Sequence, residues 1–285
     1  MSHPEIDPQF SSYVTGKPSL SYVQPTDAPL KKFIINGLER LLGRSKLEKI
    51  YWKLKNKPFD IQEFFSDAMA LGKLHVNHRG LNPDDLNVAG PLIFLANHPF
   101  GIIDGMVLCD IAAKARGNFR ILIHSALCQD GDLAPYFLPV DFEDTKHAMK
   151  TNIRTKQLAL EAISNNIPLL IFPAGMVSTA SKFGFGSVKD APWTTFAAKL
   201  VKQSKATVVP LYFHGRNSRT FHIASHLGGS LRTGLLMHEA LNKFGGSIDV
   251  AVGEPISPEQ LQDYTHRQEL TDVLYSKVQA LKFKR

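Results

Sequence analysis

Three short and continuously apolar runs constrain the fold of this 285-residue chain more than any other feature. They are the segments 92–95, 121–123 and 169–172. Strands covered on both faces have such runs, whereas a strand with one face in water alternates apolar and polar residues. Segments with helical periodicity lie between the runs. We therefore expect an α/β fold with a mixed, mostly parallel central sheet flanked by helices.

The same alternation predicts individual elements along the rest of the chain. Strands are expected at 73–78, 92–96, 119–125, 168–172, 207–213 and 247–252. Helices are expected at 104–116, 152–164, 191–204, 233–242 and 258–281. No internal repeat separates these segments, which favours one α/β domain.

The N-terminal part of the chain has a different composition. Residues 1–28 are polar and rich in Pro and Ser, and we expect them to be irregular. Residues 29–71 form a basic helical annex, because apolar residues recur there at helical spacing. Gly43 separates its first two helices, Pro58 ends the second, and a third is expected at 61–71. Residues 72–285 then make up the α/β domain.

The basic excess of the chain is concentrated in this annex. Between residues 29 and 57, nine basic residues face only Glu39 and Glu48, and the difference of +7 equals the formal net charge of the whole chain. Such a surface suits an anionic membrane, with Trp52 as an interfacial anchor. The alternative is that the annex packs its apolar stripe on the α/β domain. The charge favours the membrane.

Cysteine usage and hydropathy indicate the compartment. Cys109 and Cys128 lie in apolar stretches, so we expect reduced core residues rather than a disulfide framework. No run of about 18 apolar residues is present, and the N-terminus lacks the charged and apolar regions of a secretory signal. These features predict a cytoplasmic protein that binds peripherally to the inner face of the cell membrane.

The segment that follows the expected strand at 92–96 contains a histidine and a carboxylate, His98 and Asp104. Ligands of open α/β sheets bind at the carboxyl ends of strands. A carboxylate can hold an imidazole in one tautomer and stabilise its protonated form, which makes a histidine a general base near neutral pH. We expect His98 as the base and Asp104 as its orienting partner. The plainer alternative is a turn histidine beside a helix N-cap.

Two further strand ends carry candidate substrate-binding residues. Phe172–Ser178 reads Phe-Pro-Ala-Gly-Met-Val-Ser, and its backbone N–H groups could hold an oxyanion. In the segment His214–Arg219, Arg216 is a candidate for phosphate or carboxylate recognition. The alternatives are a strand exit in which Gly175 serves backbone geometry, and a solvated loop cation.

The order and spacing of these segments resemble the glycerophospholipid acyltransferase family, which includes the enzymes that acylate lysophosphatidate. The resemblance covers residues 73–257 and rests on Asn97-His98-Pro99 with a following Asp-Gly, on Phe-Pro-x-Gly-x-x-Ser, and on Val209-Pro210. It implies the acyltransferase fold and a histidine that deprotonates an acceptor hydroxyl, which attacks an acyl thioester. His98 and Asp104 match the base and its orienting aspartate. Phe172–Ser178 matches the segment that lines the acceptor site.

The chain departs from the commonest pattern of that family at three points. Five residues rather than four separate His98 from Asp104, and Gly101 can absorb the extra one without moving the contact. Ala174 stands where the family has a glutamate, and residues 139–141 lie where a family arginine would fall. In these respects the chain resembles a bacterial subgroup with a five-residue gap, including enzymes that acylate lyso-ornithine lipid or related lysolipids.

The expected function is therefore O-acyl transfer from a thioester of acyl carrier protein or CoA to the hydroxyl of a lysolipid. The acceptor is lysophosphatidate-like or a lyso-ornithine lipid, and the role lies in lipid metabolism and phospholipid biosynthesis. The expected catalytic residues are His98 and Asp104. The expected substrate-binding residues are Asn97, Gly101, Gly105, Phe172, Pro173, Ala174, Gly175, Ser178, Arg216 and Asn217.

No cofactor beyond the donor thioester is expected, and no metal site. His222 and His226 lie four apart without an acidic third ligand, so we expect surface histidines. The chain has no Gly-x-Ser-x-Gly elbow of a serine hydrolase and no nucleotide-binding loop after a strand. A nucleic-acid binder would not need a His–Asp pair at a strand end. A catalytically silent lipid- or membrane-binding relative of the same fold stays open as the alternative.

Overall fold

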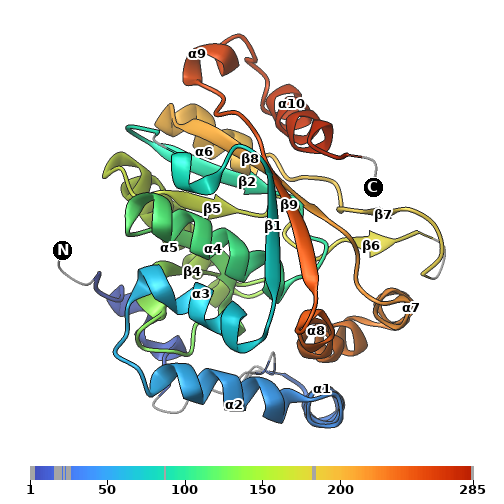
Figure 1. Cartoon of the computed structure of the whole chain (residues 1–285). Coiled ribbons are helices and arrows are strands. Elements are labelled where there is room, and N and C mark those ends of the chain that lie inside the picture. The colour runs from blue at the N-terminus through green and yellow to red at the C-terminus, as the bar shows by residue number, and fades with distance from the viewer. Residues whose placement is uncertain are drawn as a thin grey trace.

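The computed structural model describes residues 4–15, 21, 23, 27–86, 88–181 and 184–283. Within these residues a seven-stranded sheet lies between layers of helices (Figure 1), with the strand order β1-β9-β8-β2-β5-β3-β4. Its strands are β1 (His75–Gly80), β2 (Leu92–Ala96), β3 (Arg120–His124), β4 (Phe137–Val140), β5 (Leu169–Ile171), β8 (Thr207–His214) and β9 (Ser247–Val252). A separate two-stranded hairpin pairs β6 (Thr179–Ala180) with β7 (Val188–Lys189).

The strand directions confirm a mixed, mostly parallel sheet. The five neighbours β8, β2, β5, β3 and β4 run parallel to one another. At one edge β9 pairs antiparallel with β8, and β1 runs parallel to β9. Strand β2 is buried on both faces, since none of its five side chains is more than 1% exposed. The apolar run at 92–95 is therefore a central strand, as its sequence predicted.

Helices cover both faces of the sheet and form a hydrophobic core with each of them. Helices α3 (Ile61–Leu71) and α4 (Ile102–Arg116) pack on the face to which Phe94 points. On the face to which Ile93 and Leu95 point lie α5 (Lys146–Ser164), α6 (Phe196–Ser204) and α10 (Arg267–Ala280). The other helices are α1 (Pro29–Leu41), α2 (Arg44–Lys55), α7 (Arg219–Leu227), α8 (Gly229–Lys243) and the short α9 (Pro258–Leu261).

The basic annex packs against the α/β domain. Helix α1 contacts α8, and α2 contacts both α3 and α8. Gly43 ends the α1–α2 turn with a φ of +106°, a left-handed conformation that favours glycine. Tyr51 is buried in α2 and its hydroxyl donates a hydrogen bond to Asp130, which also forms an ion pair with Lys55. The apolar stripe of α2 therefore packs on the domain. None of the described helices combines the length and hydropathy needed to cross a bilayer.

Several elements differ from the sequence prediction. Strand β4 was not expected, and Pro139 fits there because β4 is an edge strand. Helix α7 was not expected either, and it starts where the Ser218 hydroxyl accepts a hydrogen bond from the Phe221 N–H. The single helix predicted at 258–281 is two helices, α9 and α10, with a turn between them.

The prediction of an irregular N-terminal segment falls partly outside the described residues, and within them one stretch is regular. A turn of 3₁₀-helix spans Pro8–Tyr13, and the side chain of Phe10 is buried in the core beside α5 and α6. The Asp7 carboxylate forms an ion pair with Arg154 of α5. Single apolar residues in a polar segment carry no periodic signal, so the sequence could not indicate this contact.

Candidate active site

The candidate base and its partner meet where β2 turns into α4. The Nδ1 atom of His98 lies 3.0 Å from Oδ2 of Asp104. Asp104 has no exposed surface, whereas the His98 side chain is 17% exposed. Asp104 Oδ2 also accepts hydrogen bonds from the N–H groups of Phe100 and Gly101, at 2.7 and 2.9 Å. A fixed carboxylate thus faces one side of an imidazole whose other side can be reached from outside.

The geometry of the turn explains how a five-residue gap keeps this contact. Gly101 adopts a φ of +85° at the start of α4, a conformation that side chains rarely adopt. A Cβ atom there would lie 3.2 Å from both Val177 and Leu236. The contact is therefore kept across the five-residue gap with Gly101 in a left-handed conformation, and Asp104 reaches back from the first turn of the helix.

Burial determines the electrostatics of the pair. Removal from water raises the pKa of Asp104, and the contact with His98 and the two backbone N–H groups oppose that rise. The carboxylate is thus costly to keep ionised unless His98 and these donors face it. Its Oδ1 atom has no hydrogen-bond partner among the described residues.

The segment Phe172–Ser178 packs directly against His98. The Phe172 ring stacks on the imidazole with the ring centroids 4.0 Å apart. The Ser178 N–H donates to the carbonyl oxygen of His98 at 2.7 Å. Gly175 has a φ of +66° and donates its N–H to the Phe172 carbonyl, which closes the turn. Two segments far apart in the sequence therefore form one site, as their strand-end positions predicted.

Asp190, which the sequence analysis did not single out, joins these two segments. Its Oδ1 accepts hydrogen bonds from the His98 N–H, at 3.2 Å, and from the Ser178 hydroxyl. Its Oδ2 accepts one from the indole N–H of Trp193 at 2.9 Å. Asp190 follows the short strand β7 and belongs to no motif, so only its position in the fold identifies it. Its hydrogen bonds connect the backbone of His98 to the side chains of Ser178 and Trp193.

The side chains of Asn97 and Asn217 form hydrogen bonds with backbone groups rather than facing the open side of the site. Both polar groups of the Asn97 side chain bond the backbone of Phe213 in β8, at 2.9 and 2.7 Å. The Asn217 side chain is 2% exposed and donates to the Phe100 carbonyl at 3.5 Å, while its Oδ1 has no partner among the described residues. Their predicted contact with substrate stays a prediction.

The remaining predicted binding residues surround the turn. Pro173 and Ala174 are buried, and the Pro173 carbonyl accepts the N–H of Thr194. Gly105 lies in the first turn of α4, with no atom within 4 Å of where a Cβ would stand. Arg216 is exposed in the loop after β8, and its carbonyl accepts a hydrogen bond from Lys243 of α8 at 3.0 Å.

Lys243 is a cation near the pair that the sequence analysis did not single out. Its ammonium nitrogen lies 4.9 Å from the centroid of the Phe100 ring. Burial lowers the pKa of Lys243, and the carboxylates of Glu239 and Asp104 oppose that shift. Phe100 is thus held between Lys243 and the backbone at Gly215, where a Cβ would lie 2.5 Å from the ring.

The prediction of two surface histidines was wrong for His222. Its side chain is fully buried in α7, with Nδ1 accepting the Ala180 N–H and Nε2 without a partner among the described residues. The segment has no apolar run that would have indicated this burial. Both cysteines are buried core residues, as predicted. Across the described ranges, no group of three or more His, Cys, Asp and Glu side chains could hold a metal ion.

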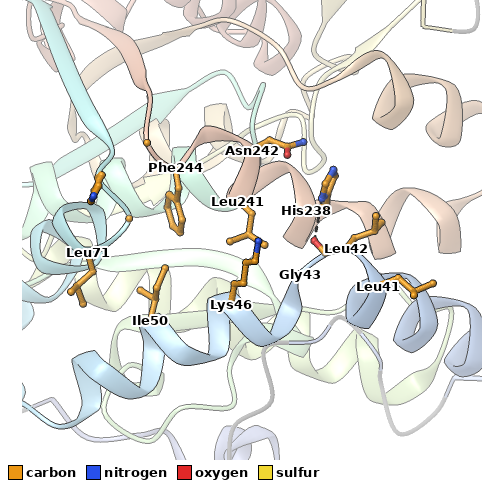
Figure 2. A pocket seen from close by; sticks show the side chains of 13 residues that line it. Leu41, Leu42, Gly43, Lys46, Ile50, Leu71, His238, Leu241, Asn242 and Phe244 are labelled. Atoms are coloured by element: carbon orange, nitrogen blue, oxygen red, sulfur yellow. Dashed lines mark hydrogen bonds between the residues drawn. The ribbon is translucent and has the colours of Figure 1, made fainter.

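A groove of about 570 Å³ lies apart from this site, between α2 and the C-terminal part of α8 (Figure 2). Ile50, Leu241 and Phe244 line it, and Lys46 lies at α2 beside Leu241. His238 borders it and contacts the Leu42 carbonyl through Nδ1 at 3.1 Å. None of the predicted site residues lines the groove.

Comparisons with known proteins identify relatives of the chain. The family model described as Acyltransferase matches residues 29–284, which include the annex. A lyso-glycine lipid O-acyltransferase of Phocaeicola vulgatus is 29% identical over 244 residues, covering 83% of this chain and 82% of that protein. Another, from Bacteroides thetaiotaomicron, is 26% identical over 198 residues, covering 68% and 67%.

One solved structure provides a comparison of the fold. The 1-acyl-sn-glycerophosphate acyltransferase PlsC of Thermotoga maritima matches with a TM-score of 0.52 and 14% sequence identity. The match covers 90% of this chain and 93% of that chain. At this identity the likeness concerns the fold alone, and it extends over nearly the whole of both chains.

Proposed function

The chain belongs to the acyltransferase family, and from this premise we propose that it transfers a fatty acyl group from a thioester to the hydroxyl of a lysolipid. The observation that carries the proposal is the 3.0 Å contact between His98 and the buried Asp104 at the end of a central strand. The two relatives named lyso-glycine lipid O-acyltransferases favour a lysolipid acceptor. Lyso-glycine lipid thereby joins lysophosphatidate and lyso-ornithine lipid as a candidate.

In the proposed mechanism, Asp104 accepts the Nδ1–H of His98 and leaves Nε2 as the base. Nε2 takes the proton of the acceptor hydroxyl while the oxygen of that hydroxyl attacks the thioester carbonyl carbon. The tetrahedral intermediate then expels the thiolate, which receives the proton from His98. An ester and a free thiol result, and His98 is neutral again. No covalent intermediate on the enzyme is needed, so the buried cysteines have no part in it.

Donors for the oxyanion are available in the segment after β5. The N–H groups of Gly175 and Ser178 are already used, by the Phe172 and His98 carbonyls. Those of Met176 and Val177 bond no described residue. We assign these two N–H groups to the oxyanion, because preorganised donors of this kind stabilise the charge that develops in acyl transfer.

We further propose that the annex docks on an anionic membrane surface. Leu30, Phe33 and Leu41 of α1 are 71%, 77% and 85% exposed, and their spacing places them on one side of the helix. An apolar face of this kind inserts among lipid headgroups, and basic side chains next to it attract anionic lipids.

Eight of the nine basic residues between positions 29 and 57 fall into two groups. Lys31, Arg44, Lys55 and Lys57 form ion pairs with carboxylates within the described chain. Arg40, Lys46, Lys49 and Lys53 have no carboxylate within ion-pair distance among the described residues. These four cations and the 44% exposed Trp52 are available to a membrane. Docking at the inner face would bring the site to acyl carrier protein and CoA thioesters.

The test is acyl transfer by the purified chain from acyl-CoA or acyl carrier protein to each of the three lysolipids. We expect release of one thiol per ester formed with at least one of these acceptors. Mass spectrometry of lipids from cells lacking the protein then identifies the acceptor as the lyso-species that accumulates. No transfer, together with unchanged lipids, would favour the catalytically silent relative.

A further inference from the structure

Arg232 on α8 lies beside the segment Phe172–Ser178. One terminal nitrogen of its guanidinium donates a hydrogen bond to the Val177 carbonyl, and the other lies 3.9 Å from the sulfur of Met176. Its guanidinium carbon is 5.8 Å from the centroid of the Phe221 ring. The side chain is partly buried by these neighbours. It therefore borders the part of the site that the acceptor is proposed to enter.

The charge of Arg232 is not balanced within the described part of the chain. No described carboxylate lies within 4.0 Å of it, whereas Arg44 and Arg154 have Glu48 and Asp7 as partners. Burial lowers the pKa of Arg232, with no acidic group opposing the shift. A partly buried cation without a partner is costly, and an anion that binds there removes much of that cost.

Arg232 lies close to the turn that carries His98 and Asp104. Val177 precedes Ser178, whose N–H bonds the His98 carbonyl. Leu236 lies one helical turn after Arg232, and its side chain packs against Gly101, where an added Cβ would be 3.2 Å from it. The face of α8 that carries Arg232 therefore lies across the His98–Asp104 turn. The segment 172–178 itself contains no acidic residue, and the Asp190 carboxylate beside Ser178 already accepts three hydrogen bonds.

We propose that Arg232 binds the anionic head group of the acceptor, a carboxylate or a phosphate, and so selects acidic lysolipids. This inference rests on the proposed function. A guanidinium presents a planar fork of donors that matches both groups, and only part of that fork is used by the Val177 carbonyl. Lys243 is the weaker candidate, because the carboxylates of Glu239 and Asp104 already act on it.

The test compares acidic acceptors with neutral counterparts. The probes are an N-(3-hydroxyacyl)glycine with its methyl ester, and lysophosphatidate with monoacylglycerol. The variants are Arg232→Gln and Arg232→Lys, and Arg219→Gln is the control because Arg219 is an exposed arginine on the adjacent α7. Loss of a charged hydrogen bond predicts that Arg232→Gln lowers kcat/KM for the favoured acidic probe about tenfold to a hundredfold.

We expect this loss in KM rather than kcat, little change with the matching neutral probe, and partial recovery in Arg232→Lys. Whichever acidic probe the wild type prefers identifies the head group as carboxylate or phosphate. An equal loss with acidic and neutral probes would overturn the inference and leave Arg232 as a support of the Val177 loop. Unchanged kinetics would overturn it as well.

Failure of the proposed function gives a different result. If the wild type acylates none of the probes, the acyl-transfer proposal fails first. The anion site is then tested by calorimetric titration with the N-(3-hydroxyacyl)glycine and with lysophosphatidate. Binding of either acid at least tenfold weaker in Arg232→Gln than in Arg219→Gln supports the site. Equal binding by these two variants, or no binding by the wild type, contradicts it.

Discussion

Asp104 Oδ2 lies 3.0 Å from His98 Nδ1 and is fixed from its other side by two backbone N–H groups. The carboxylate therefore has one position, and it faces one nitrogen of the imidazole. Because the pair is formed by one turn between β2 and α4, substitution of the Asp104 side chain should separate the chemistry from the stability of the fold, whereas a change in the backbone of the turn should affect both.

Asp104→Asn should lower acyl transfer about 10²- to 10⁴-fold, because an amide does not stabilise the protonated base. The folded-state pKa of Asp104 is raised, so its ionised form costs folding free energy above that pKa, and the cost disappears below the unfolded value near ~3.9. We expect the melting temperature of the variant to equal or exceed that of the wild type at pH 7. Any difference between the two melting temperatures should become smaller as the pH falls towards ~4. Asp110→Asn, on the same helix, is the control for activity. A fully active Asp104→Asn enzyme would contradict the assigned role.

Gly101→Ala should destabilise the protein by about 1–3 kcal/mol, because alanine must adopt a positive φ. The new Cβ would also press on Val177 and Leu236. Displacement of the turn should lower kcat together with the melting temperature. Gly37→Ala in α1, where no atom lies within 4 Å of the added Cβ, should leave both unchanged or raise stability. Equal behaviour of the two variants would show that the turn tolerates a side chain.

Asp190→Ala should lower kcat about tenfold or more and reduce the free energy of unfolding by about 1–3 kcal/mol. It removes the acceptor for His98, Ser178 and Trp193 at once. Asp190→Asn keeps one acceptor oxygen, so its kcat and its free energy of unfolding should lie between those of the wild type and Asp190→Ala. KM should change little in either variant. The exposed Asp263 provides the control substitution to alanine. If kcat were unaffected by Asp190→Ala, the residue would not position His98.

Replacement of Leu30, Phe33 and Leu41 by glutamine should weaken binding to vesicles containing anionic lipid at least tenfold. The reason is that burial of an apolar face drives interfacial binding, at about 25 cal/mol per Å². Transfer to a water-soluble, short-chain acceptor should be unchanged. Leu227→Gln removes an exposed leucine from α7 and should bind vesicles like wild type. Vesicle flotation measures this, and undiminished binding by the triple variant would contradict docking through α1.

The features that could be predicted from the sequence are those that a short local segment determines by itself. The apolar run at 92–95 had to be a central strand, and Gly43 had to end a helix. The His98–Asp104 contact followed from the turn between them. These predictions need only local sequence and the rule that parallel strands place their ends together.

The features that could not be predicted depend on contacts between distant segments. Asp190 accepts a hydrogen bond from His98, which precedes it by 92 positions, and Arg232 donates one to Val177 at a separation of 55. The burial of His222 and the pairing of β4 at the sheet edge are likewise tertiary. No periodicity encodes such contacts, so a structure was needed to find them.

The central claim is that His98 is the base for acyl transfer. The direct measurement is the initial rate of thiol release from acyl-CoA or acyl carrier protein in His98→Ala, compared with His75→Ala, an exposed histidine in β1. With the acceptor that the wild type prefers, we predict a loss of about 10²- to 10⁴-fold in His98→Ala and none in His75→Ala. A His98→Ala enzyme within twofold of wild type would contradict the account.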